Sequence, residues 1–162
     1  ACEASTAKVL ASKIGDSGKF YTSDYGKLGA KAVQKAMEGF LTTMQQSFND
    51  MIENGRSIVV NITFDEMSDY DTATEVGEDG FELRDVLELW MEENAYKNYY
   101  HIQGTTDKKM IFDEVRIPLK DPKTGRNYNV NKFSMSLAMF FKQYGMQVER
   151  NLNGGTLYIT VR

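Results

Sequence analysis

The chain has 162 residues, of which 41% are hydrophobic and 26% are charged, and this composition is typical of a folded globular protein rather than a disordered one. The formal net charge of -4 argues against a dedicated nucleic-acid binder, because such proteins usually present a basic surface. No apolar run is long enough to span a bilayer, so we expect no transmembrane segment.

The first third of the chain predicts one strand and one long helix. Residues 5–14 carry Val9, Leu10 and Ile14 before two glycines, a pattern typical of a short strand that ends in a turn. Over residues 27–54, apolar side chains recur at steps of three and four residues and predict a long amphipathic helix that stops at Gly55. The heptad-like spacing lasts too few turns for a coiled coil, so we expect these side chains to pack in a core.

The remaining residues predict an α+β domain. Alternating apolar residues predict strands over 57–64, 99–105, 110–119, 147–152 and 156–161, and helical periodicity predicts helices over 81–94 and 131–144. The phase of the apolar residues changes within 110–119, which predicts a bulge near Asp113 and Glu114. The two helical stripes consist of Leu83, Val86, Leu87, Trp90 and Met91, and of Phe133, Leu137, Phe140, Phe141 and Tyr144.

This order, β-α-β-β-α-β-β, contains the β-α-β-β-α-β order of the ferredoxin-like split unit with one extra strand. We therefore expect a mainly antiparallel sheet with its helices on one face, preceded by the long amphipathic helix. The predicted organisation is a part over 1–54, which would be the tail of an upstream domain, and an α+β domain over 55–162.

No motif of a known catalytic or metal site occurs. The acidic segment 65–79 lacks the EF-hand pattern at Ala73 and Val76, which favours a solvated loop and leaves only a weak calcium site open. His101 is the only histidine and Cys2 the only cysteine, so neither a zinc site nor a standard nucleophile relay is expected. We predict no catalytic residue and no cofactor, with an enzyme of unrecognised class as the alternative.

Four tyrosines form the one candidate binding surface. Tyr96, Tyr99, Tyr100 and Tyr128 combine large contact area with polar tips, as residues of binding surfaces do, but a rim of the hydrophobic core is the favoured interpretation and a binding surface the alternative. The nine methionines are predicted to fill the core rather than to form a peptide groove.

Two stretches resemble known envelope proteins. Residues 4–12 (ASTAKVLAS) and 28–36 (LGAKAVQKA) resemble the final strand and helix of the curli-secretion lipoprotein (CsgG-like) family, with Ala7 in place of a glycine. Residues 116–119 (RIPL), 125–126 (GR) and 132–134 (KFS) resemble the C-terminal region of uncharacterised Bacteroidetes envelope proteins. The first residue is Ala rather than Met, which predicts a processed chain or a piece of a longer one.

These resemblances imply a periplasmic or secreted protein, and they carry no known catalytic or binding residues. Cys2 after Ala1 is similar to the end of a lipoprotein signal, but a chance cysteine is the favoured interpretation and a lipid-anchored residue the alternative. The resulting hypothesis is a non-enzymatic envelope interaction or assembly module that binds protein or glycan through an exposed sheet edge or the tyrosine-rich end. A structural domain that forms a homodimer through the long helix is a further alternative.

Overall fold

The computed structural model describes residues 1–3, 9–19 and 21–162, the side chain of Glu38 excepted. The chain consists of two compact units, Ala1–Glu53 and Asn54–Arg162.

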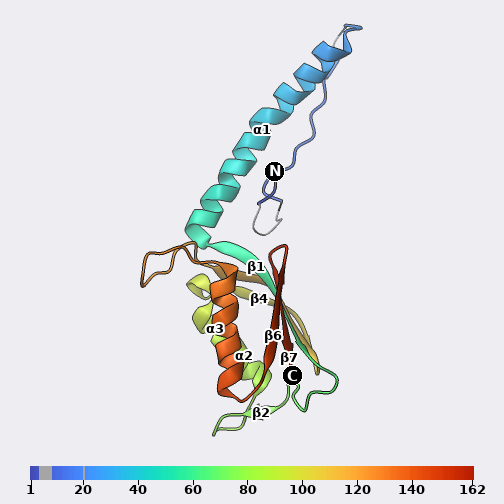
Figure 1. Ribbon diagram of the computed structural model, residues 1–162. Coiled ribbons are helices and arrows are strands. Elements are labelled where there is room, and N and C mark those ends of the chain that lie inside the picture. Colours follow the sequence, from blue (N-terminus) through green and yellow to red (C-terminus); the bar gives the residue numbers. More distant parts are fainter. Residues whose placement is uncertain (4–8, 20) are drawn as a thin grey trace. The chain divides into compact units, whose positions relative to one another are not determined.

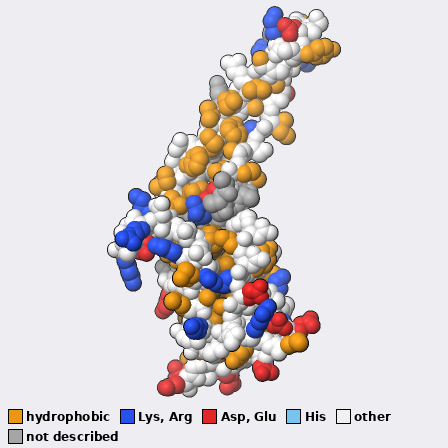
Figure 2. All heavy atoms as spheres, in the orientation of Figure 1, with side chains coloured by type: hydrophobic (Ala, Val, Ile, Leu, Met, Phe, Trp, Pro, Cys, Tyr) orange, Lys and Arg blue, Asp and Glu red, His pale blue; other side chains and the backbone are white. Residues whose placement is uncertain are grey.

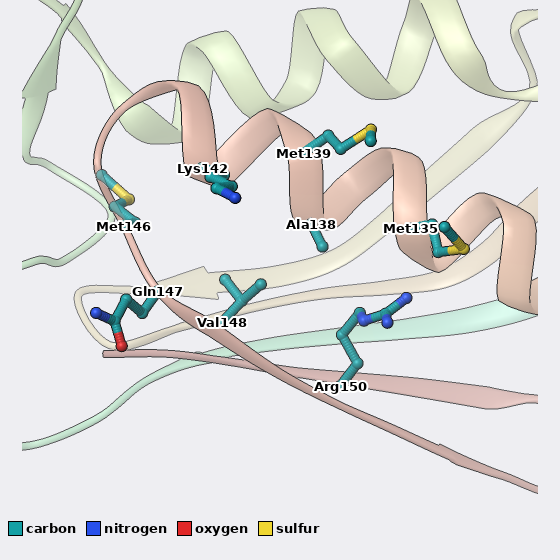
Figure 3. A pocket seen from close by; sticks show the side chains of 8 residues that line it. All are labelled: Met135, Ala138, Met139, Lys142, Met146, Gln147, Val148 and Arg150. Carbon is teal, nitrogen blue, oxygen red and sulfur yellow. The ribbon is translucent and has the colours of Figure 1, made fainter.

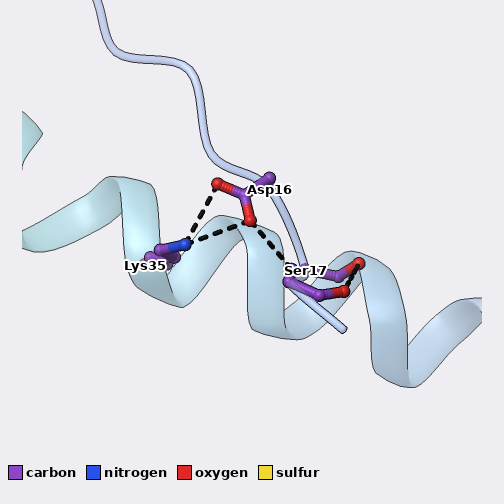
Figure 4. A network of polar contacts seen from close by, with 4 residues as sticks. Asp16, Ser17 and Lys35 are labelled. Carbon is purple, nitrogen blue, oxygen red and sulfur yellow. Dashed lines mark hydrogen bonds and ion pairs between the residues drawn. The ribbon is translucent and has the colours of Figure 1, made fainter. Parts of the chain in front are cut away.

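The first unit is built on one long helix, α1 (Tyr25–Asn54), with the preceding segment lying along it (Figure 1). The Ser47 hydroxyl donates a 2.7 Å hydrogen bond to the carbonyl oxygen of Leu10. Nearer the start of the helix, Lys35 Nζ lies 3.0 Å from both carboxylate oxygens of Asp16 (Figure 4). The contact with Lys35 and the Gly18 backbone N–H lower the pKa of Asp16, and the contact with Lys35 joins the segment to the helix.

The strand predicted over 5–14 lies partly outside the described residues. Within the described part of this segment, Val9 to Ile14, the strand-like pairing is limited to an isolated bridge between Val9 and Cys2. The segment packs closely on the helix instead, since a Cβ on Gly15 would lie 2.1 Å from the Ala32 carbonyl oxygen. Small helix residues thus provide a surface for an extended segment that has no sheet to join.

One stripe of α1 does not pack as predicted. Its large apolar side chains are 41–68% exposed, whereas the sequence pattern predicted core packing (Figure 2). The stripe consists of Val33, Met37, Leu41, Phe48 and Ile52. The preceding segment packs against small residues of the helix, and the larger side chains remain exposed.

The second unit is the predicted α+β domain. Its five-stranded open sheet has the order β4-β5-β1-β7-β6, in which β7 pairs with β1 in parallel and the other neighbours are antiparallel. The strands are β1 (Arg56–Phe64), β4 (Tyr100–Thr106), β5 (Lys109–Ile117), β6 (Val148–Asn153) and β7 (Thr156–Val161). Two helices, α2 (Leu83–Asn94) and α3 (Val130–Gln143), cover one face of this sheet (Figure 1). The predicted fold class is confirmed.

The core lies between that face and the two helices. In β1 the alternate residues Ile58, Val60, Ile62 and Phe64 are buried, as expected for a strand with one covered face. The predicted bulge is confirmed, because β1 residues 58 and 60 pair with β5 residues 115 and 112. The helices contribute Leu83, Leu87, Met91, Phe133, Leu137, Phe140 and Phe141 as buried residues, with Val86, Trp90 and Tyr144 packed at the margin.

The acidic segment 65–79 is more structured than predicted. It contains β2 (Glu75–Val76), which pairs with β3 (Phe81–Glu82), so the following helix starts at Leu83 and not at residue 81. Thr72 is buried in this segment and donates a 3.0 Å hydrogen bond to the Thr106 carbonyl oxygen. None of the helices within the described residues is long and apolar enough to cross a membrane.

Candidate functional site

The segment between α2 and β4 makes a strained turn, η1 (Tyr96–Asn98). Lys97 and Asn98 both have φ of 56°, in the left-handed region that residues other than glycine rarely adopt. The Asn98 amide donates a 2.9 Å hydrogen bond to the Glu92 carbonyl oxygen, and Lys97 Nζ donates a 3.1 Å hydrogen bond to Asn54 Oδ1. These contacts hold a conformation that costs free energy, a feature that is concentrated at functional sites.

A first cavity of about 260 Å³ opens beside this turn and is lined by Asn54, Tyr96, Lys97, Tyr99 and Arg116. The Arg116 guanidinium lies 5.7 Å from the centre of the Tyr99 ring. It is also 2.8 Å from the Glu114 carboxylate and donates a 3.2 Å hydrogen bond to the Gly55 carbonyl oxygen. These contacts hold the Arg116 side chain in place at the wall of the cavity.

A second cavity of about 390 Å³ shares Tyr96 and Lys97 with the first and extends to Tyr128. Burial raises the pKa of the Tyr128 phenol, and the negative charge of Asp121 adds to this effect. The backbone N–H groups of Thr124 and Lys123 donate to the Asp121 carboxylate and lower its pKa. The remaining lining residues are Glu93, Asn94, Ala95, Pro118, Pro122 and Lys123. We call the two cavities together the tyrosine corner.

Three of the four predicted tyrosines belong to this corner, and Tyr100 does not. The Tyr100 hydroxyl donates a 3.1 Å hydrogen bond to Glu88 of α2, and its ring packs edge-on at 6.1 Å from that of Phe112. Burial, followed by the Glu88 carboxylate, raises its pKa. Tyr100 is thus a rim residue of the core, while ligand binding by Tyr96, Tyr99 and Tyr128 stays a prediction.

A second candidate site, which the sequence reasoning missed, is a groove of about 430 Å³ between α3 and the edge strand β6. Ala138 of the helix and Val148 of the strand point toward one another across it (Figure 3). We call this the β6 groove, and it is lined by Met135, Ala138, Met139, Lys142, Met146, Gln147, Val148 and Arg150. Met135 and Met139 are 47% and 67% exposed, which corrects their predicted place in the core, while Met91, Met110 and Met146 are buried.

The backbone of β6 presents hydrogen-bonding groups at the open edge of the sheet. Gln147 stands opposite Arg162 and accepts its N–H at 2.8 Å. Because bonded and non-bonded pairs alternate in an antiparallel ladder, the N–H and C=O groups of Val148, Arg150 and Leu152 point away from β7. Within the described residues no strand pairs with this outer edge.

Comparison with known proteins assigns the second unit to a family. Residues 56–162 match the family described as a domain of unknown function, DUF6175. The chain belongs to the DUF6175 family. No curated protein and no solved structure matches the chain significantly. The match covers both the tyrosine corner, apart from Asn54, and the β6 groove.

The only histidine of the DUF6175 domain has a partner that the sequence did not predict. His101 Nδ1 lies 2.6 Å from Asp113 Oδ1, and their side chains are 67% and 42% exposed. Tyr100 faces α2, so the alternation along β4 directs His101 to the other face of the sheet. Among the residues that the structure describes, no group of three or more His, Cys, Asp or Glu side chains could hold a metal ion. The absence of catalysis by His101 stays a prediction.

The His101 contact predicts a titration result. The hydrogen bond from His101 is the largest cause of the lowered pKa of Asp113. We expect His101→Gln to raise the Asp113 pKa toward its ordinary value, as followed by carboxyl-carbon NMR. At pH values above about 3.9, the ordinary pKa of an Asp side chain in the unfolded chain, the contact stabilises the fold. This stabilisation is lost as the pH falls through the lower pKa that Asp113 has in the folded protein. Asp121, whose lowered pKa comes from backbone N–H groups, is the internal control, and an unchanged Asp113 pKa would refute the assignment.

The spacing of residues in α3 indicates the β6 groove in the sequence. Met135, Ala138, Met139 and Lys142 follow the spacing i, i+3, i+4, i+7, so they form one stripe on a helix. A different stripe of the same helix enters the core. The helix α3 therefore carries a second apolar stripe, in which Met135 and Met139 are exposed.

Proposed function

We propose that the DUF6175 domain is a non-enzymatic interaction module that binds an extended segment of a partner protein along β6. The observation that carries this proposal is the β6 groove beside a strand edge whose backbone groups point outward. An added strand would satisfy these groups, and its alternate side chains would enter the groove, as in other cases of strand addition. Exposed methionines suit this role because their flexible thioethers adapt to different side chains.

The other edge of the sheet is less suited to strand addition. The pairing of β4 with β5 shifts register on both sides of Ile102, and such bulges interrupt the regular row of backbone groups. The pairing of β6 with β7 runs without a shift over six residue pairs. A straight, regular edge is a better template for an incoming strand.

The charged residues of the groove indicate which kind of partner segment would bind there. Lys142 and Arg150 are the ionisable residues of the groove, and no carboxylate lines it. Arg150 hydrogen-bonds the neutral Ser134 hydroxyl at 3.1 Å, and neither cation forms a salt bridge within the described residues. We therefore infer a segment in which apolar residues alternate with polar ones and acidic residues flank them.

Selection from a displayed library of random peptides against the whole chain tests this proposal. We expect enrichment of acidic, alternating sequences whose binding falls at least tenfold with Ala138→Trp, which fills the groove. Leu89→Trp, exposed on α2 and outside the groove lining, should leave binding unchanged. Lys142→Glu should reduce the preference for acidic sequences. Enriched peptides that bind equally well to Ala138→Trp, or no enrichment at all, would refute the proposed function.

A second pair of variants distinguishes strand addition from a helix lying in the groove. Val148→Pro removes one outward N–H group without removing a hydrogen bond to β7. We expect it to abolish binding of the selected peptides, while Val148→Thr, similar in shape and with the N–H retained, should preserve it. Equal binding by both variants would show that the partner does not pair with the strand.

The envelope location is part of this proposal and is supported by the resemblances of residues 4–12, 28–36 and 116–134. It includes the role of residues 1–54 as the tail of an upstream domain. Fractionation of cells that express the full precursor tests the location, with labelling by a palmitate analogue before and after Cys2→Ser. A precursor found wholly in the cytoplasm would refute it.

The exposed stripe of α1 favours a second candidate function, a structural domain that forms a homodimer through this helix. Large apolar side chains on a long helix are a common means of pairing with a second copy. Light scattering of the whole chain should then show a dimer that Leu41→Glu converts to a monomer. A monomeric wild-type chain at high concentration would remove this candidate.

A further inference from the structure

We infer that the tyrosine corner is a second binding site of the domain, separate from the β6 groove, and that its ligand is a neutral saccharide. The two cavities meet at Tyr96 and Lys97, so they form one continuous lining that contains three tyrosine rings. Their size is in the range of small-molecule sites, where a few fixed polar groups orient the ligand. None of the residues in this lining belongs to the β6 groove.

The balance of charge favours a neutral ligand. The corner has three cationic residues, Lys97, Arg116 and Lys123, and two carboxylates, Glu93 and Asp121. The carboxylate of Glu114 lies against Arg116, and Lys132 Nζ lies 3.8 Å from the Asp121 carboxylate, so Arg116 and Asp121 both have a partner of opposite charge. The remaining charges of the lining, those of Lys97, Lys123 and Glu93, nearly cancel, so an anionic ligand would gain little net attraction.

The hydrogen-bonding groups favour hydroxyls. The lining combines donors and acceptors: the cations only donate, the carboxylates of Glu93 and Asp121 only accept, and the Asn94 amide nitrogen donates to the Trp90 carbonyl oxygen, which leaves its side-chain oxygen as an acceptor. Sugar hydroxyls can donate and accept at the same atom, so they match this mixed set. The C–H face of a sugar ring is apolar and packs on aromatic rings, and Tyr99 is 50% exposed although Arg116 lies near its ring.

The geometry of the corner is fixed before a ligand arrives. The left-handed turn at Lys97 and Asn98 is held by side-chain hydrogen bonds to residues 54 and 92. Asp121 likewise fixes its own loop through two backbone N–H groups. A site whose side chains are already ordered loses less entropy on binding, which matters most for weak ligands such as short sugars.

The experiment is an NMR titration of the whole ¹⁵N-labelled chain with a panel of neutral oligosaccharides of glucose, mannose, galactose and N-acetylglucosamine. Glucuronate and inorganic phosphate are the anionic probes. We expect at least one neutral sugar to shift the amide signals of Tyr96 to Tyr99 and Tyr128, and the β6 signals to stay in place. Shifts caused only by the anionic probes, or no shift with any neutral sugar, would overturn the inference.

Three variants make the test specific. Tyr99→Ala should weaken sugar binding at least tenfold, while Tyr100→Phe, outside the corner, should leave it unchanged. Lys97→Gly removes the amine and relieves the left-handed strain, so the melting temperature should stay or rise while binding falls. Unchanged binding in both Tyr99→Ala and Lys97→Gly would overturn the inference. These results are independent of peptide binding at the β6 groove, so either proposal can fail alone.

Discussion

Replacing Phe133 by Ala is expected to lower the free energy of unfolding of the second unit by about 3–5 kcal/mol, as large aromatic truncations in a core do. Phe133 is fully buried, and the Trp90 ring packs edge-on against it at 5.5 Å between ring centres. Phe133 belongs to α3 and Trp90 to α2, so the ring joins the two helices within the core. Truncation therefore leaves a cavity in the core and removes the aromatic contact with Trp90.

Met139→Ala is the matched control on the same helix. Its side chain is 67% exposed, so the free energy of unfolding should change by less than about 0.5 kcal/mol. Urea denaturation of both variants measures the difference. A loss above about 1.5 kcal/mol for Met139→Ala would show that the methionine belongs to the core. Met139 could then not serve as a flexible contact residue of the β6 groove.

The contrast between these two residues shows what the sequence could predict. Helical and strand periodicity is a local property, and it correctly placed β1, α2, α3 and the bulge in β5. The paired strands β2 and β3 have two residues each, too few for any alternation to be visible. Periodicity also says which residues share a face, but not which of two apolar faces enters the core, as α3 illustrates.

The sequence predicted only part of the tyrosine corner, because periodicity is local and the corner is built from several segments. Tyr99 and Tyr100 are neighbours in an extended segment, so their side chains point to opposite faces, and alternation alone could have separated them. The other members come from distant parts of the chain: Asn54 is 43 positions from its partner Lys97. Nor does the sequence reveal that Lys97 and Asn98 adopt left-handed backbone, since neither is glycine. Such features depend on tertiary packing.

Gly55 lies next to the tyrosine corner, where its carbonyl oxygen accepts a hydrogen bond from Arg116 of the lining. It has φ of 79°, and a Cβ there would lie 2.5 Å from the Ile117 carbonyl oxygen and 2.9 Å from Cδ1 of the Tyr96 ring. The carbonyl oxygen belongs to a paired strand and cannot retreat without breaking the β1–β5 ladder, because Arg56 stands opposite Ile117. Any added methyl group must therefore displace the Tyr96 ring, the strand, or both.

We expect Gly55→Ala to lower the free energy of unfolding by about 2–5 kcal/mol, the sum of left-handed backbone strain and overpacking. Gly77→Ala is the control: its φ is 77°, but nothing lies within 4 Å of the added Cβ, so only the backbone strain of about 1–2 kcal/mol remains. Urea denaturation gives both values, and equal losses would show that the space around Gly55 can relax. Because the Tyr96 ring must move, Gly55→Ala should also shift the amide signals of Lys97 and Tyr99, whereas Gly77→Ala should leave them in place. This second measurement separates a distorted tyrosine corner from a merely less stable domain.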